Sequence, residues 1–330
     1  MYLTRLLAGE EASIPDISPE ALNDYNFSSP AAGCFQFEPK SDETGFDLVI
    51  SCGIHGNETA PIEICDALLE NLCNGSQSIL NRLLLIFGNL PAIRAGERFL
   101  DENMNRLFDG THECKNHPEA QRAGELEAIM ASFYQTAPAG RHRIHLDLHT
   151  AIRDSQHQRF AIYPYQDKSR PLPEYAVNML KEANISAVLL GHKPSTTFSY
   201  HSAKHHDALS FTVELGKVRP FGANPTEDFK GIRDVLKDLL REQVSYWEVD
   251  RLQDASLEQF EVVDELIRHY DDFELNLPEN LANFSILDKG AQITMDGDKS
   301  YIVKEADRAI VFPNAKIPIG QRAGLIISKK

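Results

Sequence analysis

The hydrophobic residues of this 330-residue chain follow one pattern up to about residue 250 and a different pattern after it. Before that point, short apolar runs alternate with longer stretches in which apolar residues recur every three or four positions, as in buried strands and amphipathic helices. The runs predict strands at 46–51, 82–89, 143–150, 160–164, 187–191 and 210–216, and the stretches predict helices at 61–73, 118–134, 173–182 and 226–246. We therefore predict an α/β domain at residues 1–249, with a largely parallel mixed sheet flanked by helices.

The two ends of the chain lack this alternation. Residues 1–45 are weakly periodic and predict a lead-in with an edge strand around 34–37. From residue 250, short β-like runs at 260–267, 284–286, 300–303, 309–312 and 324–327 are separated by turn residues such as Gly290 and Gly297. This pattern predicts a small C-terminal all-β domain at 250–330.

Composition narrows the class of protein. Hydrophobic residues make up 42% and charged residues 25% of the chain, as in soluble globular proteins. No apolar run reaches the roughly 18 residues of a membrane span. The N-terminus does not resemble a signal peptide, and the five cysteines form no CxxC pair, so we expect a cytoplasmic protein. The net charge of −16 argues against nucleic acid as a partner, because phosphate binding needs a basic face. An oligomer is compatible with this sequence but not indicated by it.

A candidate metal site lies in the segment SCGIHGNETAP, between the first predicted strand and the first predicted helix. Two glycines let this short loop bend, and open α/β sheets bind ligands at the carboxyl ends of their strands. His55 and Glu58 offer the nitrogen and oxygen ligands that zinc accepts. The alternative is a polar loop with one solvated histidine and one solvated glutamate.

A third ligand candidate comes from the predicted strand RIHLDLHT at 143–150. Alternate residues of a strand share a face, so His145, Asp147 and His149 point to the same side. His149 lies at the carboxyl end, and Asp147 could accept a hydrogen bond from the second ring nitrogen of a metal-bound histidine. The alternative is a polar strand face with hydrogen-bonded histidines.

A candidate general base comes from the strand SFTVELG at 210–216. Glu214 ends an otherwise apolar strand, where a buried carboxylate is costly unless it is paired or functional. It fits a base with a raised pKa that removes a proton from water. A salt bridge to a nearby Arg or Lys is the alternative.

An anion site is indicated by the segment RAGERFLDENMNR, which contains three arginines and Asn105. In a protein this acidic, fixed cations are needed to hold an anionic substrate, and arginine binds carboxylates with two parallel hydrogen bonds. Surface pairing of these arginines with Asp101 and Glu102 is the alternative. A further histidine-rich segment, 192–207, has no carboxylate at a suitable spacing and is predicted to be a mobile loop near the site.

Four segments in this order, GIHGNETAP, ERFLDENMNR, HLDLHT and TVELG, resemble the succinylglutamate desuccinylase and aspartoacylase family, which belongs with the zinc carboxypeptidases. The likeness covers about residues 46–246, and the family's C-terminal β domain resembles 250–330. The resemblance implies a zinc-carboxypeptidase-like fold with one Zn²⁺ per subunit. It also implies hydrolysis of N-succinyl-L-glutamate to succinate and L-glutamate, a step of arginine catabolism by the succinyltransferase route.

The resemblance also assigns roles to individual residues. The zinc ligands fall on His55, Glu58 and His149, the catalytic acid/base on Glu214, and the substrate-binding residues on Arg98, Asn105 and Arg106. A substrate-binding tyrosine of the family is not placed, with Tyr163 and Tyr165 as candidates. Two alternatives stay open: an aspartoacylase-like or carboxypeptidase-like hydrolase of another N-acyl amino acid, and a non-catalytic zinc- or anion-binding protein of the same fold.

Overall fold

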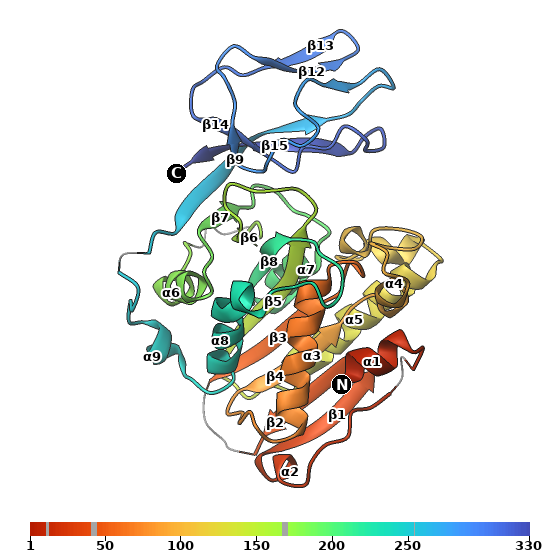
Figure 1. The fold of residues 1–330 in the computed structure, drawn as a ribbon, viewed down its shortest axis with the longest axis vertical. Coiled ribbons are helices and arrows are strands. Elements are labelled where there is room, and N and C mark those ends of the chain that lie inside the picture. Colours follow the sequence, from red (N-terminus) through yellow and green to blue (C-terminus); the bar gives the residue numbers. More distant parts are fainter. Residues whose placement is uncertain (11–12, 41–44, 167–170, 254) are drawn as a thin grey trace.

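One long mixed sheet organises the protein. The computed structural model describes residues 1–10, 13–40, 45–166, 171–253 and 255–330 (Figure 1). Within them the sheet has the strand order β1-β2-β4-β3-β5-β8-β6-β7-β9-β15-β14-β11. Its strands are β1 (Tyr25–Ala31), β2 (Cys34–Pro39), β3 (Phe46–Cys52), β4 (Arg82–Phe87), β5 (His142–Ala151), β6 (Phe160–Tyr163), β7 (Ala187–Leu190), β8 (Leu209–Lys217), β9 (Glu258–Ile267), β11 (Ser285–Ile286), β14 (Arg308–Val311) and β15 (Arg322–Lys329). A smaller sheet contains β10 (Glu274–Leu275), β12 (Gln292–Asp296) and β13 (Lys299–Ile302).

The centre of the long sheet is parallel. Strands β4, β3, β5 and β8 are parallel to one another, and β6 is parallel to β7. The pairs β1–β2, β2–β4 and β6–β8 are antiparallel. The carboxyl ends of β3, β5 and β8 therefore lie together at one edge, because parallel neighbours share direction and register. This arrangement confirms the predicted α/β domain with a largely parallel mixed sheet and a small C-terminal β domain.

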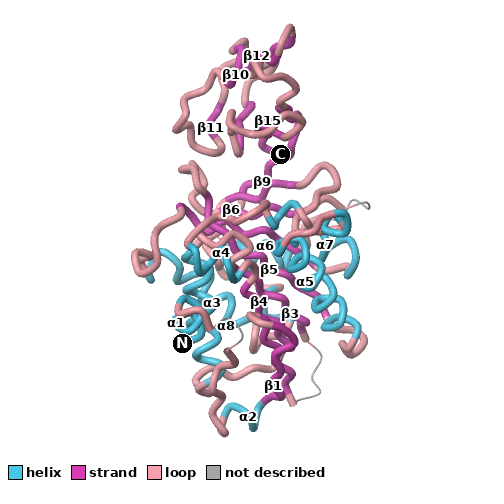
Figure 2. The backbone as a smooth tube through the Cα atoms, turned by 90° about the vertical axis from the view of Figure 1, so that its right-hand side faces the viewer, coloured by secondary structure: helices cyan, strands magenta, loops and turns pink. Residues whose placement is uncertain are grey.

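Helices cover both faces of this sheet. They are α1 (Tyr2–Leu7), α2 (Ala21–Asp24), α3 (Thr59–Cys73), α4 (Leu90–Ala95), α5 (Pro118–Gln135), α6 (Glu174–Glu182), α7 (Phe198–His206), α8 (Lys230–Leu239) and α9 (Val244–Trp247), with short 3₁₀ turns η1 (Met104–Arg106), η2 (Thr111–Cys114) and η3 (Thr226–Phe229). Figure 2 shows them on either side of the strands.

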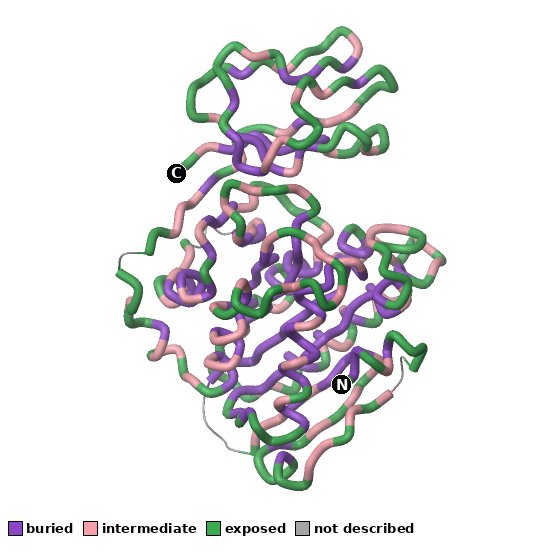
Figure 3. Tube along the Cα trace, in the orientation of Figure 1, coloured by how far each residue is buried: buried purple, intermediate pink, exposed green. Residues whose placement is uncertain are grey.

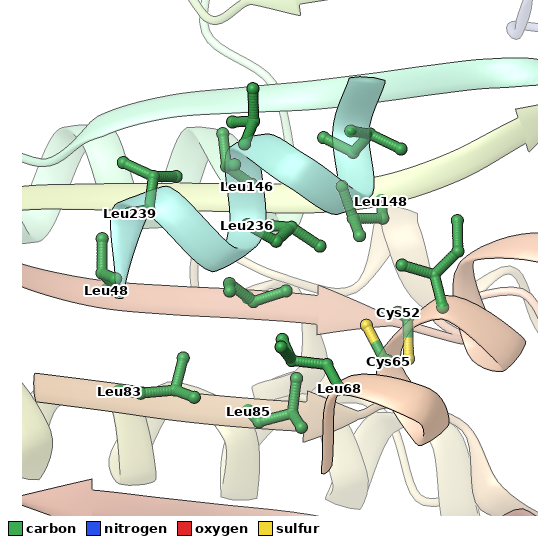
Figure 4. Packing of buried hydrophobic residues seen from close by; sticks show 14 of the residues in the cluster. Leu48, Cys52, Cys65, Leu68, Leu83, Leu85, Leu146, Leu148, Leu236 and Leu239 are labelled. Carbon is green, nitrogen blue, oxygen red and sulfur yellow. The ribbon is translucent and has the colours of Figure 1, made fainter. Parts of the chain in front are cut away.

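The two faces of the sheet differ in chemistry. On one face, leucines of α8 and α3 pack over apolar residues of β3, β4 and β5, as Figure 4 shows for Leu236, Leu68 and Leu146. On the other face, a smaller cluster joins β3 and β4 to α5 and to Phe198 of α7. The strands at the centre are almost wholly buried (Figure 3). The second face also carries His145, Asp147 and His149 of β5, and the His145 ring packs against Phe198.

Several local predictions need correction. The predicted helix at 226–246 is η3, α8 and α9 in succession, because Asn81 donates to the carbonyls of Leu239 and Glu242 and interrupts the helical hydrogen bonding there. The strand around 34–37 is second in the sheet, with β1 outside it. The segment 192–207, predicted to be a loop, contains α7, whose first turn is capped by the Thr197 hydroxyl accepting from Tyr200 N. The sequence pattern did not reveal the short elements α1, α2, α4, β1, β10 and β12.

The C-terminal β domain is joined to the sheet of the larger domain. The first residues of β9 pair in parallel with β7, and β9 then continues into an antiparallel pair with β15. In Figure 1, β9 leaves the larger body and enters the smaller one. The boundary at 249/250 stays a prediction. No helix in the described part of the chain is long and apolar enough to cross a membrane.

Candidate active site

The loop after β3 is shaped by close backbone contact. Gly53 has a φ of 65°, a left-handed conformation that favours glycine. A Cβ on Gly56 would lie 2.1 Å from the backbone carbon of Ala92 in α4, so no larger residue fits there. The two glycines thus press the loop against α4 and leave His55 and Glu58 buried at the carboxyl end of β3. Helix α3 begins directly after Glu58, with Pro61 in its first turn as expected.

Three predicted ligands converge around the Glu58 carboxylate. His55 Nδ1 lies 2.9 Å from Glu58 Oε1, and His149 Nδ1 lies 2.9 Å from Glu58 Oε2. The three side chains are buried, and their candidate ligand atoms all lie within 4.8 Å of one another. Glu58 and His149, which are 91 positions apart in the chain, are brought together because β3 and β5 are parallel neighbours.

The opposite ring nitrogens of both histidines are held in place. His55 Nε2 donates to Asn103 Oδ1 over 2.8 Å, and His149 Nε2 donates to Asp147 Oδ2 over 2.9 Å. Asp147 in turn accepts from the Ser51 hydroxyl at 2.6 Å. Such hydrogen bonds fix the orientation of a metal-binding imidazole and direct its other nitrogen toward the ion.

His55 provides a direct test of whether a cation fits. Its Nε2 carries the proton that Asn103 accepts, and burial lowers the pKa of His55, which favours the neutral ring. Nδ1 is then a lone-pair acceptor facing the carboxylate of Glu58 at 2.9 Å, and it has no hydrogen-bond partner among the described residues. Two acceptors at this distance repel each other unless both bind a shared cation. The arrangement fits a metal ion.

The electric field at His149 favours positive charge. Burial opposes protonation of the ring, but the carboxylates of Asp147 and Glu58 outweigh burial and raise the pKa of His149 well above its usual range. Arg98 Nη1 also donates to Glu58 Oε1 at 2.7 Å, and the backbone N–H of Thr150 donates to Oε2 at 3.0 Å. A divalent cation would compete with the His149 proton for the same carboxylates, so metal binding would release that proton.

Glu214 lies beside this group, on the neighbouring strand. It is the register partner of His149 across the β5–β8 pair, and its Oε2 has no hydrogen-bond partner among the described residues. Burial, followed by the negative charge of Glu58, raises the pKa of Glu214 to about 7. The expected alternative for this residue, a salt bridge, does not occur among the described residues. A carboxyl with a pKa near 7 can both accept and release a proton at neutral pH.

The arginine-rich segment reaches the same site. Arg98 contacts Glu58, as above. The side-chain oxygen of Asn105 accepts from Phe198 N at 3.0 Å, which leaves its amide NH₂ as the group available to a ligand. Arg106 is exposed, and the hydrogen bond of its guanidinium goes to the Asn105 carbonyl at 2.7 Å rather than to an acid. The expected alternative, pairing of these arginines with Asp101 and Glu102, is not observed for Arg98 or Arg106.

Two positioning residues were missed by sequence reasoning. Asn103 holds His55, and Glu119 of α5 accepts the backbone N–H groups of Leu100, Asp101 and Glu102 at 2.6–2.9 Å. Glu119 thereby shapes the loop that carries Arg98 and Asn103. Nothing in the sequence links Glu119 to a loop about 18 residues before it. Of the two candidate tyrosines, Tyr163 packs against Phe211 in the core, whereas Tyr165 is half-buried.

The fold and the site together define a zinc-carboxypeptidase-like protein, with candidate ligands at the carboxyl ends of parallel strands. The chain belongs to the succinylglutamate desuccinylase/aspartoacylase family. The catalytic domain of that family matches residues 44–240, and its AstE/AspA barrel-sandwich hybrid domain matches residues 255–330.

Individual relatives are similar over most of the chain. A succinylglutamate desuccinylase of Shewanella piezotolerans is 40% identical over 304 residues, which cover 89% of this chain and 86% of the relative. One of Pseudomonas fluorescens is 42% identical over 290 residues, which cover 88% and 85% of the two chains.

Solved structures of this family are similar to the chain in fold and in sequence. The crystal structure of the succinylglutamate desuccinylase of Chromobacterium violaceum is 35% identical, with a TM-score of 0.84 and coverage of 100% of this chain and 97% of that one. That of Vibrio parahaemolyticus is 33% identical, with a TM-score of 0.87 and coverage of 99% and 94%. Murine aminoacylase 3 is 17% identical with a TM-score of 0.58, covers 88% and 97%, and shares the fold.

Proposed function

We propose that this protein is a zinc-dependent amidohydrolase that cleaves N-succinyl-L-glutamate to succinate and L-glutamate in arginine catabolism. The main observation behind this proposal is that His55, Glu58 and His149 converge on one point. Beside them, Glu214 Oε2 has no hydrogen-bond partner among the described residues. The relatives at about 40% identity, which are named succinylglutamate desuccinylases, support this choice of substrate.

We assign the metal to one site per subunit, held by His55 Nδ1, His149 Nδ1 and the Glu58 carboxylate. Two histidines and a glutamate are a ligand set that zinc accepts in hydrolases. When bound there, zinc would polarise the amide carbonyl and lower the pKa of water. Asn103 and Asp147 would keep the two rings oriented through their Nε2 atoms.

Glu214 would move the protons of the reaction. Its ionised form removes a proton from the attacking water, and its protonated form returns that proton to the nitrogen of the departing glutamate. Both forms are populated near neutral pH, because burial and the charge of Glu58 raise the pKa of Glu214 to about 7. The reaction consumes one water and one amide and produces one carboxylate and one amine.

Arg98, Asn105 and Arg106 would hold carboxylates of the substrate. Arg106 has no acidic partner among the described residues and is exposed to an incoming ligand. These fixed positive charges would overcome the repulsion between a trianionic substrate and a chain of net charge −16. A cytoplasmic location is supported by the five free cysteines, four of which are buried.

The decisive experiment supplies N-succinyl-L-glutamate to the zinc-loaded protein and measures free glutamate. Hydrolysis at rates typical of enzymes, lost on chelation and restored by zinc, is expected. N-acetyl-L-glutamate and N-acetyl-L-aspartate serve as comparison substrates, and equal kcat/KM for the acetyl and succinyl compounds would favour the aspartoacylase-like alternative. Absence of turnover with every acyl amino acid and peptide tested would favour the non-catalytic alternative.

A further inference from the structure

A row of buried polar side chains leads away from the candidate metal ligand His149. Its Nε2 donates to Asp147 Oδ2 at 2.9 Å, and the hydroxyl of Ser51 on β3 donates to Asp147 Oδ1 at 2.6 Å. The Ser51 oxygen also lies 2.9 Å from Nε2 of His145 on β5. These four residues are at most 2% exposed, so bulk water does not compete for their hydrogen bonds.

The direction of the last contact follows from a count of protons. A serine hydroxyl has one proton, and Ser51 gives it to Asp147. His145 Nε2 must therefore donate its own proton to the Ser51 oxygen. The other nitrogen of this ring, Nδ1, then carries no proton, and it has no hydrogen-bond partner among the described residues. Burial lowers the pKa of His145 to about 4, which favours such a neutral ring.

The carboxylate of Asp147 depends on this row. Its side-chain oxygens have one donor each among the described residues, His149 on Oδ2 and Ser51 on Oδ1. Without the Ser51 proton, Oδ1 would be a buried acceptor with no partner, which costs free energy. Rotation of the carboxylate would relieve that cost and would break its hydrogen bond to His149. The donor on Oδ1 thus determines how well Oδ2 orients the ring.

The far end of the row is fixed by packing. Ser51 and Asp147 are register partners across the β3–β5 pair, so their backbones keep a constant separation. The ring of His145 meets Phe198 of α7 edge to face, with centroids 4.8 Å apart and planes at 78°. The ring therefore has little freedom to turn away from Ser51. The whole row is in place without a bound metal.

We propose that Ser51 and His145 are positioning residues of the metal site, which hold the Asp147 carboxylate in the orientation that directs His149 Nδ1 to the metal. This inference rests on the zinc site of the function proposed above. Both residues act through Asp147 and are not assigned as ligands. Hydrogen bonds behind a metal-binding histidine raise metal affinity, because they orient the ring and make its free nitrogen more basic.

The test compares Ser51→Ala with a matched control, Ser210→Ala. Ser210 is equally buried on β8, but its hydroxyl donates to Ala208 O at 3.4 Å, outside the row. Ser51→Ala should raise the Kd for zinc about 10- to 100-fold, measured by competition with a chromophoric chelator. Ser210→Ala should match the wild type. Ser51→Thr keeps the hydroxyl and should restore part of the affinity.

Two substitutions of His145 separate its N–H donor from its packing. His145→Leu fills the space without a donor and should weaken zinc binding. His145→Gln can present an N–H group near the position of Nε2 and should recover part of the loss. The Tm of each metal-free variant is measured alongside. Zinc affinities that follow Tm rather than the presence of the donor would overturn the inference, because they would indicate a merely structural role.

Nuclear magnetic resonance of the metal-free wild type tests the direction of the row. Nitrogen–proton correlations of the histidine rings should show the proton of His145 on Nε2, with the assignment given by the signal that disappears in His145→Gln. A proton on Nδ1 instead would contradict the proposed donation to Ser51 and overturn the inference.

Zinc binding is measured without substrate, which separates this inference from the proposed function. Wild-type zinc affinity in Ser51→Ala or in His145→Leu would overturn the inference and leave the proposed function standing. Weakened zinc binding in both variants, in a protein that does not hydrolyse N-succinyl-L-glutamate, would support the inference and overturn the proposed substrate. A wild type that binds no zinc would overturn both.

Discussion

The described residues contain three groups of histidines and carboxylates with closely spaced candidate ligand atoms, and two of them, each with two histidines, differ in their surroundings. His55, Glu58 and His149 form one, and Asp109, His201 and His205 form the other, each with candidate ligand atoms within 4.8 Å of one another. The first is buried, and a hydrogen bond fixes the far nitrogen of each ring. In the second, Lys204 Nζ lies 3.0 and 2.9 Å from the two oxygens of Asp109, and the side chain of His205 is 45% exposed.

The difference lies in charge balance more than in spacing. At the first group, the carboxylates of Glu58 and Asp147 exceed the single cation Arg98, so the site attracts further positive charge. At the second, Lys204 already neutralises Asp109, and burial, then the neighbouring rings of His205 and His206, lower the pKa of His201 to about 3. We therefore expect a metal ion at the first group, which combines buried carboxylates with fixed ring orientation.

The largest effect should follow removal of a ligand from the first group. His149→Ala and His55→Ala should each lose bound zinc and all measurable activity, because three protein ligands are the minimum of a catalytic zinc site. Zinc per subunit is measured by mass spectrometry of the dialysed protein. His201→Ala is the matched control and should retain one zinc. Zinc retained by His149→Ala and lost by His201→Ala would reverse the comparison.

Glu214→Gln should separate proton transfer from metal binding. The residue is not assigned as a ligand, so zinc content should stay normal while kcat falls by about two to four powers of ten. Stopped assays of glutamate release measure the loss. Near wild-type turnover in Glu214→Gln would place the general base elsewhere.

The raised pKa of Glu214 should also appear in the stability of the metal-free protein. Glutamate has an ordinary pKa of 4.5, and burial, then the charge of Glu58, raises it to about 7 in the folded state. Between these pH values the folded state binds more protons than the unfolded state, so the free energy of unfolding falls as the pH rises. The contribution of this one group should be on the order of 2 kcal/mol.

Urea unfolding of chelator-treated protein at pH 5 and pH 8 measures this contribution. Other groups titrate in both proteins, so the wild type should lose more stability over this interval than Glu214→Gln, which cannot ionise. Equal losses in the two proteins would contradict the raised pKa.

The smallest effect on stability and activity should follow a substitution in the group of Asp109, His201 and His205. His205→Ala removes an exposed ring that contacts Asp109 at 2.7 Å, and Lys204 remains to neutralise that carboxylate. Stability should change by no more than about 0.5 kcal/mol, with zinc content and kcat unchanged. Loss of a second bound metal in this variant would show that the cluster binds a metal after all.

Local patterns in the sequence predicted which residues form the candidate metal site and its neighbouring base. Spacing within HGNE brings His55 and Glu58 onto one loop, and the two-residue period of β5 and β8 puts His149 and Glu214 at strand ends. These predictions needed only neighbours in the chain and the rule that parallel strands present ligands at their carboxyl ends. The structure brings all four together, although their chemical roles stay predictions.

The surroundings of the site could not be predicted in this way. Asn103, Glu119 and Lys204 belong to no periodic pattern, and each meets its partner through a contact between distant segments. For the histidines of 192–207, the sequence offered no carboxylate at a suitable spacing, yet folding brings Asp109 to His205 and Glu127 to His201. Lys204 of the same segment pairs with Asp109.

The sequence by itself determined the α/β alternation, the β-rich C-terminus, and the candidate ligands and base, because periodicity and strand ends are properties of neighbouring residues. Only the tertiary structure decided which charges are left unbalanced. That balance made one histidine cluster a candidate metal site, whereas in the other cluster the carboxylate of Asp109 is paired with Lys204. It depends on side chains that are far apart in the chain, and burial strengthens their interaction by excluding the water that would otherwise screen it.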